Sequence, residues 1–257
     1  MNRIQNAFDN KKAFIGFITA GDPSLDKTEE FILEMEKAGA ALVEIGIPFS
    51  DPIAEGPVIQ VANLRALSAG CTTDKIFDMV AKLRKKTQIP LAFMAYANSL
   101  YKYGYDRFCK RCAEVGIDGL IIPDMPFEEK GELQEFTGKY DLKLISLIAP
   151  TSQERIQMIA KEAEGFIYVV SSLGVTGVRD TITTDVGQIV DMIRQVTDVP
   201  TAVGFGINKP EQVHQYTQIA DGAIVGSAIV RLVAQYGEQA GPKIYEYVSE
   251  MVGGLAE

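Results

Sequence analysis

One acidic residue of this sequence stands inside an apolar segment. Glu44 lies between Val43 and Ile45, and in an extended strand these neighbours point to the opposite face from Glu44. A buried carboxylate is costly unless it is paired, hydrogen-bonded or neutral. It is therefore either a buried salt-bridge partner or a general acid or base whose pKa is raised towards neutrality by burial.

Two further acids follow in an unusual loop. Residues 46–57 contain three prolines, which restrict the backbone, and two glycines, which permit special backbone angles. The loop presents Asp51 and Glu55, and ordinary loop acids of this kind are simply solvated. The density of prolines favours a rigid loop instead. Glu44 and Glu55 can then converge on one substrate and divide acid and base duties between them.

Glycine pairs in the second half of the chain suggest a phosphate site. Glycine lets backbone N–H groups approach phosphate oxygens, and a helix amino terminus favours the anion. Any one pair would indicate only a tight turn, but three successive sets favour phosphate, with Ser227 able to cap the following helix and donate to the anion. Residues 204–209 lack the third glycine of a dinucleotide site. The pairs are Gly174 and Gly177, Gly204 and Gly206, and Gly222 and Gly226.

Eight short apolar runs recur along the chain, separated by segments with helical periodicity. The runs are almost continuously apolar, as expected of parallel strands buried on both faces. Tyr96 and Tyr168 fall near the ends of two of them, either as core residues or as a wall for a flat apolar ring. The runs are 13–20, 41–47, 89–96, 117–123, 142–149, 165–171, 199–205 and 221–226, and the helical segments are 26–38, 73–85, 128–139, 153–163, 184–196 and 210–219.

This alternation predicts an α/β fold, a single (β/α)₈ TIM barrel domain over residues 1–257 with extra helices. The main alternative is a doubly wound open sheet, which would carry a nucleotide fingerprint after its first strand. Residues 19–23 read Thr-Ala-Gly-Asp-Pro and do not match that fingerprint. In a barrel the chemistry is expected at the carboxyl ends of the strands.

Composition excludes several classes of protein. The 257 residues carry a net charge of −9, with 47% hydrophobic and 23% charged residues, which is ordinary for a globular chain and not for a disordered or collagen-like one. The acidic balance argues against nucleic-acid binding. We expect neither a membrane span nor a signal peptide, and a cytoplasmic location.

Cysteine and histidine offer little for a metal or redox site. Cys109 and Cys112 have CxxC spacing, but within a predicted helix, where two buried cysteines are the simpler interpretation. A zinc site would need Cys71 and His214 from other units as well. We expect His214 on the surface of an outer helix, and no metal.

Residues 43–56, Val-Glu-Ile-Gly-Ile-Pro-Phe-Ser-Asp-Pro-Ile-Ala-Glu-Gly, closely resemble the signature of the tryptophan synthase alpha chain family. The resemblance extends over essentially the whole chain. Further family-like stretches are 17–23, 94–98, 123–126, 174–177, 204–207 and 226–230.

The resemblance implies a retro-aldol cleavage of indole-3-glycerol phosphate into indole and glyceraldehyde 3-phosphate, without a metal or organic cofactor. Glu44 matches the glutamate that protonates the indole ring carbon and takes the proton from the side-chain hydroxyl. Glu55 matches a second acid, usually aspartate, that stabilises the positive ring nitrogen. Glutamate is one methylene longer than aspartate, so the carboxylate chemistry is kept but the loop is expected to sit differently.

The same resemblance implies the substrate contacts. Segment 171–183 is expected to be a mobile lid, in which Thr176 meets Asp51 or the substrate. The residues expected around the indole are Phe17, Tyr96, Tyr168 and Phe205, and those at the phosphate are Gly177, Gly206, Gly226 and Ser227.

The implied partner is a pyridoxal phosphate-dependent beta chain in an α₂β₂ heterotetramer, with the interface expected at 48–57 and 123–127. Pyridoxal phosphate is expected only on that partner. Two alternatives remain open. One is another phosphate-binding barrel, such as a sugar-phosphate isomerase. The other is a catalytically weak chain that mainly activates the beta chain.

Overall fold

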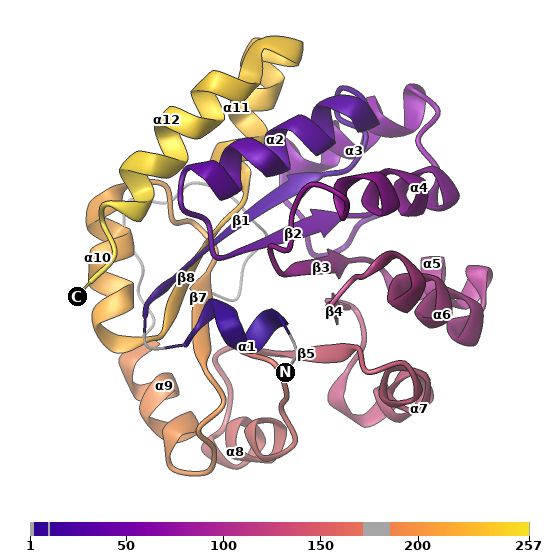
Figure 1. The fold of residues 1–257 in the computed structure, drawn as a ribbon. Coiled ribbons are helices and arrows are strands. Elements are labelled where there is room, and N and C mark those ends of the chain that lie inside the picture. The colour runs from indigo at the N-terminus through magenta and orange to yellow at the C-terminus, as the bar shows by residue number, and fades with distance from the viewer. Residues whose placement is uncertain (1–2, 10, 172–185, 257) are drawn as a thin grey trace.

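The computed structural model describes residues 3–9, 11–171 and 186–256, and its centre is a closed barrel of eight parallel strands (Figure 1). Each strand pairs with the next along the chain, and the last pairs with the first, which confirms the predicted (β/α)₈ barrel. The strands are β1 (Ala13–Thr19), β2 (Leu42–Gly46), β3 (Leu91–Met94), β4 (Gly119–Ile121), β5 (Lys143–Ile148), β6 (Ile167–Val170), β7 (Thr201–Gly204) and β8 (Gly222–Val225).

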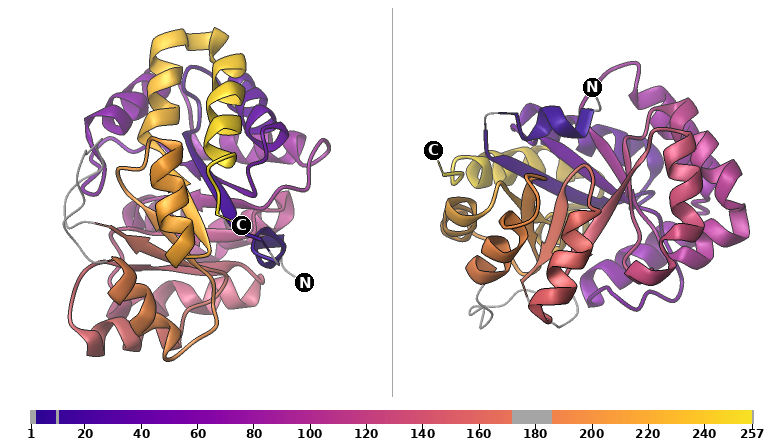
Figure 2. Two further views of the ribbon diagram at one scale, coloured as in Figure 1. Left: turned by 90° about the vertical axis from the view of Figure 1, so that its left-hand side faces the viewer. Right: turned by 90° about the horizontal axis from the view of Figure 1, so that it is seen from below.

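Helices surround the barrel on the outside, as Figure 2 shows. Each predicted helical segment contains a helix, although segment 128–139 begins as a 3₁₀ turn and residues 184–185 lie outside the described chain. The α-helices are α1 (Arg3–Ala7), α2 (Leu25–Lys37), α3 (Pro57–Ser68), α4 (Thr73–Leu83), α5 (Ala97–Tyr103), α6 (Tyr105–Val115), α7 (Gly131–Lys139), α8 (Gln153–Lys161), α9 (Val186–Arg194), α10 (Pro210–Ile219), α11 (Ser227–Tyr236) and α12 (Ala240–Val252), and the 3₁₀ turns are η1 (Phe127–Glu129) and η2 (Gly237–Gln239).

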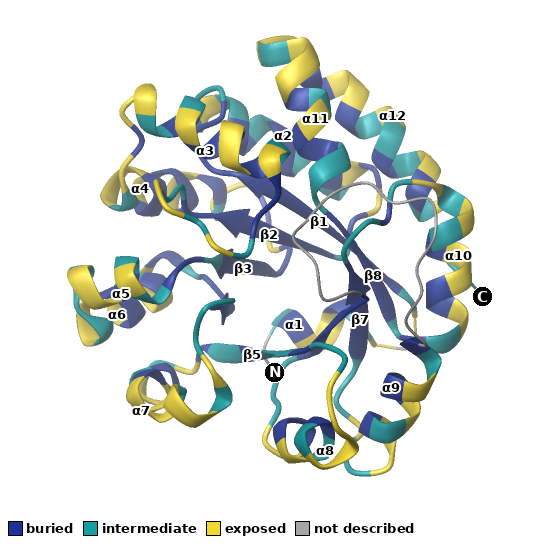
Figure 3. Ribbon diagram, turned by 180° about the vertical axis from the view of Figure 1, so that it is seen from behind, coloured by how far each residue is buried: buried dark blue, intermediate teal, exposed yellow. Residues whose placement is uncertain are grey.

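The core forms two shells, because strand side chains alternate between the barrel interior and the layer beneath the helices. In β1, for example, Ile15 belongs to the interior cluster and Phe14 to the outer one. The strands are accordingly buried on both faces, while the outward faces of the helices are exposed (Figure 3). β5 is the partial exception, since its burial is intermediate at four of six positions.

The two ends of the barrel differ. The short helix α1 lies across the amino-terminal end of the strands, where Ile4 and Ala7 join the interior cluster (Figure 1). The loops that follow the strands, including the proline-rich loop after β2, gather at the other end. None of the described helices is long and apolar enough to span a membrane.

Candidate active site

Glu44 lies on β2, opposite Phe17 of β1 in the strand register. Its side chain points into the barrel and is 1% exposed. Within the described part of the chain its Oε1 has no hydrogen-bond partner and no cation pairs with it. Burial raises the pKa of Glu44 to about 8, so the carboxyl group is mostly protonated at neutral pH. The salt-bridge interpretation is therefore wrong for the described residues, and the acid–base interpretation fits.

Glu55 lies at the end of the proline-rich loop, just before α3. Its carboxylate Oε2 accepts a hydrogen bond from Asn63 Nδ2 at 2.6 Å, and its backbone oxygen accepts one from Gln60 Nε2 at 2.7 Å. Burial raises the pKa of Glu55 to about 7, against the opposing effect of the Asn63 bond. Its pKa thus lies nearer to neutrality than that of an ordinary carboxyl.

Both acids line one cavity at the carboxyl end of the barrel. It contains eight of the residues singled out from the sequence, together with apolar residues that the sequence analysis missed. The predicted residues are Phe17, Glu44, Glu55, Tyr168, Phe205, Gly206, Gly226 and Ser227, and the others are Ala54, Ile59, Met94, Pro123, Leu147, Ile207, Ile224 and Ala228.

Tyr96 and Asp51, which were predicted to contact the substrate, do not line this cavity, and neither do Gly204 and Gly222 of the predicted glycine pairs. The hydroxyl of Tyr96 accepts a hydrogen bond from the N–H of Ala54 at 3.1 Å, and its ring stacks on Phe49 with centroids 5.1 Å apart. Tyr96 therefore holds the loop at two points, Phe49 and Ala54. Asp51 is exposed on the same loop, where Ser50 Oγ donates to its carboxylate.

Thr176 and Gly177 lie outside the described residues, as does the predicted lid beyond Ser171. The predictions made for them stay predictions.

Two aromatic rings form opposite parts of the wall. The Phe17 ring occupies the space above Gly46, where an added Cβ would lie 2.6 Å from Phe17 Cζ, and the Tyr168 ring lies over Gly204 in the same way. Phe205 meets Tyr168 edge-on at 6.0 Å between centroids. Phe205 itself has φ +79°, a left-handed conformation that is rare for a bulky residue. Such backbone outliers gather at functional sites.

The glycine-rich side of the cavity ends at the first turn of α11. The amino-terminal cap of this helix is Gly226, without a side-chain cap bond, so Ser227 is its first residue and not the cap predicted from the sequence. The N–H groups of a first helical turn lack intrahelical acceptors. They and the helix dipole form a site suited to an anion.

A larger cavity of about 580 Å³ adjoins the first and shares four of its residues, Ala54, Pro123, Leu147 and Phe205. It extends along β5 and beneath the loop after β4.

The predicted burial of Cys109 and Cys112 and the predicted exposure of His214 are confirmed. Cys109 and Cys112 are buried on α6, His214 is exposed on α10, and the described part of the chain has no group of three His, Cys, Asp or Glu residues that could hold a metal ion.

Comparisons with known proteins find relatives over nearly the whole chain. A family model described as tryptophan synthase alpha chain matches residues 4–254. Two curated relatives with that description are 49% identical in Lacticaseibacillus casei, covering 98% of this chain and 94% of the relative, and 52% identical in Lactiplantibacillus plantarum, covering 92% and 90%.

Solved structures are similar over the same length. A tryptophan synthase alpha chain from Legionella pneumophila has 34% identity and a TM-score of 0.88, covering 99% of this chain and 97% of that one. A chain from a tryptophan synthase complex of Pyrococcus furiosus has 32% identity and a TM-score of 0.87, covering 95% and 99%.

Proposed function

The chain belongs to the tryptophan synthase alpha chain family, and we propose from this membership how its own residues carry out the family's reaction. The reaction cleaves indole-3-glycerol phosphate into indole and glyceraldehyde 3-phosphate, which makes the chain a carbon–carbon lyase. The observation that supports the residue roles best is the fully buried Glu44 carboxyl, unpartnered at Oε1 and sharing a cavity with Glu55.

Glu44 supplies and then recovers a proton. Its protonated form, favoured at neutral pH by a pKa of about 8, donates to the indole ring carbon that bears the glycerol chain. The resulting carboxylate takes the proton from the adjacent hydroxyl. The carbon–carbon bond then breaks, its electron pair returns to the ring, and the hydroxyl-bearing carbon becomes the aldehyde. Glu44 ends the cycle protonated, so one group serves as acid and base.

Glu55 stabilises the charge that the first step creates. Protonation of the ring carbon places positive charge on the ring nitrogen, and an ionised carboxylate in a buried site interacts strongly with such a charge. Glu55 has the lower pKa of the two acids, about 7 against about 8. It is therefore the acid that ionises first, which suits it to this role.

The rest of the cavity holds the substrate. The rings of Phe17, Tyr168 and Phe205 pack against the indole, and Gly206, Gly226 and Ser227 receive the phosphate at the amino terminus of α11. The apolar wall excludes water from the proton transfers, which strengthens every electrostatic interaction within.

For the whole chain we propose a single barrel domain over residues 1–257 that needs no cofactor and works in the cytoplasm. Its proposed partner is a pyridoxal phosphate-dependent beta chain in an α₂β₂ heterotetramer. The proposed interface is 48–57 with 123–127, and the 73% exposure of Ile53 in the first of these segments supports it, because exposed apolar side chains are typical of interfaces. Family relatives include a tryptophan synthase complex from Pyrococcus furiosus.

The test is the Glu44→Gln variant, which keeps the shape of the protonated carboxyl but cannot transfer its proton. We expect indole release from indole-3-glycerol phosphate to fall by at least 10³-fold while the circular dichroism spectrum stays unchanged. Wild-type turnover by this variant would remove Glu44 from the mechanism. Measurable indole release by the wild-type chain alone would exclude the alternative that it only activates a partner.

A further inference from the structure

A buried amide lies behind Glu55. Asn63 belongs to the face of α3 that packs on the barrel, between the apolar residues Ile59, Ala62 and Ala66, and only 2% of it is exposed. A polar side chain in an apolar face is costly unless it is hydrogen-bonded. The bond from Asn63 Nδ2 to Glu55 Oε2, at 2.6 Å, satisfies it.

This bond fixes one of the two carboxylate oxygens of Glu55 to α3. Oε2 is held from below by α3, and the Gln60 side chain fixes the Glu55 backbone oxygen from the same helix. A carboxylate held at one oxygen and at its backbone has few orientations left. Donation by an amide also favours the ionised form of the acid, in opposition to burial.

The helix that carries Asn63 is itself anchored. Arg65, two residues along α3, donates Nε and Nη2 to the two carboxylate oxygens of Asp22 at 2.8 and 2.7 Å, and Asp22 is 2% exposed. Asp22 lies in the loop after β1. This bidentate pair ties α3 to the rim of the barrel, so Asn63 has a fixed place from which to hold Glu55.

We propose that Asn63 is a positioning residue for the cleavage reaction, holding Glu55 Oε2 so that Oε1 meets the ring nitrogen of the substrate. The proposal rests on the proposed role of Glu55. It also requires that the lengths of the Glu55 and Asn63 side chains are matched, so that the bond between them places the carboxylate correctly.

The first experiment compares the pH dependence of kcat for the wild type and Asn63→Leu, which keeps similar volume without the donor. Without the bond the pKa of Glu55 rises, so we expect the acidic limb of the profile to move to higher pH. We expect kcat to fall on the order of tenfold, as for loss of a hydrogen bond to a charged group, with a smaller change in KM.

Other titratable groups near Glu55 would not produce this shift of the acidic limb. Tyr96, which bonds the same loop at Ala54, has its pKa raised by burial and stays neutral. Glu44, across the cavity, has a pKa of about 8 and is protonated over the acidic limb. The matched control is Leu64→Ala on the exposed face of the same helix. It should change the melting temperature little and leave the acidic limb where it is.

The second experiment tests the matched reach and depends less on one variant folding well. Glu55→Asp shortens the acid by one methylene, and Asn63→Gln lengthens the amide by one. We expect each single variant to lose activity and the double variant to recover most of what Glu55→Asp lost. A double variant no better than the product of the two single losses would overturn the proposal.

Failure of this inference is distinct from failure of the proposed function. If Glu44→Gln abolishes indole release but Asn63→Leu shifts neither kcat nor the acidic limb, the positioning role is wrong and the mechanism stands. If Glu44→Gln remains active, the mechanism itself fails.

Discussion

At the scale of single residues, the two acids show how position sets chemistry. Glu44 is fixed by a strand inside the barrel, where burial alone acts on it, and its pKa is about 8. Glu55 is held by a loop and a helix, where an amide partly offsets burial, and its pKa is about 7. One kind of side chain is thus suited to two tasks by two environments.

The same burial makes Glu44 a stability cost that depends on pH. Its pKa is raised from 4.5 in the unfolded chain to about 8 in the folded one, so the folded state binds more protons between these values. Stability is therefore lost as pH rises from about 4.5 to about 8, by up to a few kcal/mol for a shift of this size.

Glu44→Gln should remove this dependence, because the amide stays neutral at every pH. We expect its free energy of unfolding, relative to the wild type, to increase steadily between pH 5 and pH 8, on the order of 4 kcal/mol in total. Urea denaturation at a series of pH values measures the difference. The slope of this difference against pH is the test, because a constant offset reflects only the packing of the amide. A difference that does not change with pH would show that burial does not raise the pKa of Glu44.

Residue types and spacing predicted the acids well but not which neighbours line the cavity. Tyr96 and Asp51 are close to the site along the chain, yet Tyr96 bonds to the loop and Asp51 is exposed. Irregular loops give no rule for side-chain direction. Met94, Leu147 and Ile224 were missed although strand alternation could have found them. They lie at inward positions near strand ends, where apolar residues look like ordinary core.

At the scale of elements, two strand glycines make room for the rings of the site. Gly46 ends β2 and Gly204 ends β7, and each lies beneath an aromatic ring from a neighbouring strand. A strand interior normally disfavours glycine, and its presence marks close approach of another group. These glycines let Phe17 and Tyr168 lie flat against the barrel wall.

Gly46→Ala should therefore damage the site more than the fold. The new Cβ would lie 2.6 Å from the Phe17 ring, so the ring must move into the cavity. We expect kcat/KM for indole release to fall by tenfold or more and stability to fall by about 1–3 kcal/mol, the usual cost of overpacking.

The matched control is Gly138→Ala on α7, where an added Cβ meets nothing within 4 Å. It should leave kcat/KM unchanged and raise stability by roughly 0.5–1 kcal/mol, the helix preference of alanine over glycine. If kcat/KM is also unchanged in Gly46→Ala, the present position of the Phe17 ring is not required for indole release.

Periodicity predicted all eight strands, since each is a compact apolar run between helical segments, but it overlooked several helices, among them α3. That helix occupies much of the long interval between the second and third strands. Its apolar residues do not form one stripe, because Val61 and Leu64 are 49% and 56% exposed while Asn63 is buried. A polar residue facing inward and apolar residues facing outward weaken the amphipathic pattern. The inward-facing polar residue, Asn63, is the one that bonds to Glu55.

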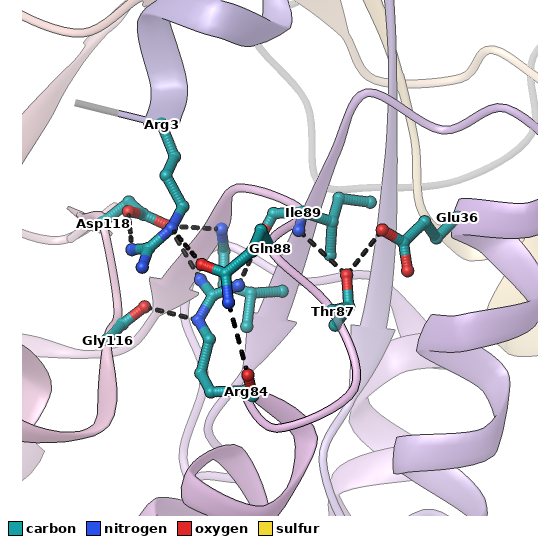
Figure 4. A network of polar contacts seen from close by, with 9 residues as sticks. Arg3, Glu36, Arg84, Thr87, Gln88, Ile89, Gly116 and Asp118 are labelled. Carbon is teal, nitrogen blue, oxygen red and sulfur yellow. Dashed lines mark hydrogen bonds and ion pairs between the residues drawn. The ribbon is translucent and has the colours of Figure 1, made fainter. Parts of the chain in front are cut away.

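At the scale of the whole molecule, the two ends of the barrel have different functions. The carboxyl end holds the acids and loops, and the amino end is closed by a polar network (Figure 4). At its centre is Asp118, 5% exposed, whose carboxylate accepts from Arg3 at 2.9 Å, from Arg84 at 2.8 Å and from the N–H of Leu91 at 2.9 Å. These bonds join α1, the end of α4 and the starts of β3 and β4.

This network should affect stability and leave catalysis unchanged, because the chemistry of a barrel takes place at the carboxyl ends of its strands, and Asp118 lies at the opposite end. Asp118→Ala would leave the Arg84 side chain, 9% exposed, without its carboxylate. We expect a loss of about 3–5 kcal/mol in the free energy of unfolding, the usual effect of removing one partner of a buried pair.

Arg3→Ala provides the graded comparison, because the Arg3 side chain is 36% exposed and its removal leaves the Arg84–Asp118 pair in place. We expect a loss on the order of 1 kcal/mol there. In both variants kcat per folded molecule should stay near that of the wild type, measured below the unfolding transition. A base variant that folds fully yet releases indole slowly would show that the network also shapes the distant mouth, since α1 packs into the interior cluster that includes Tyr168.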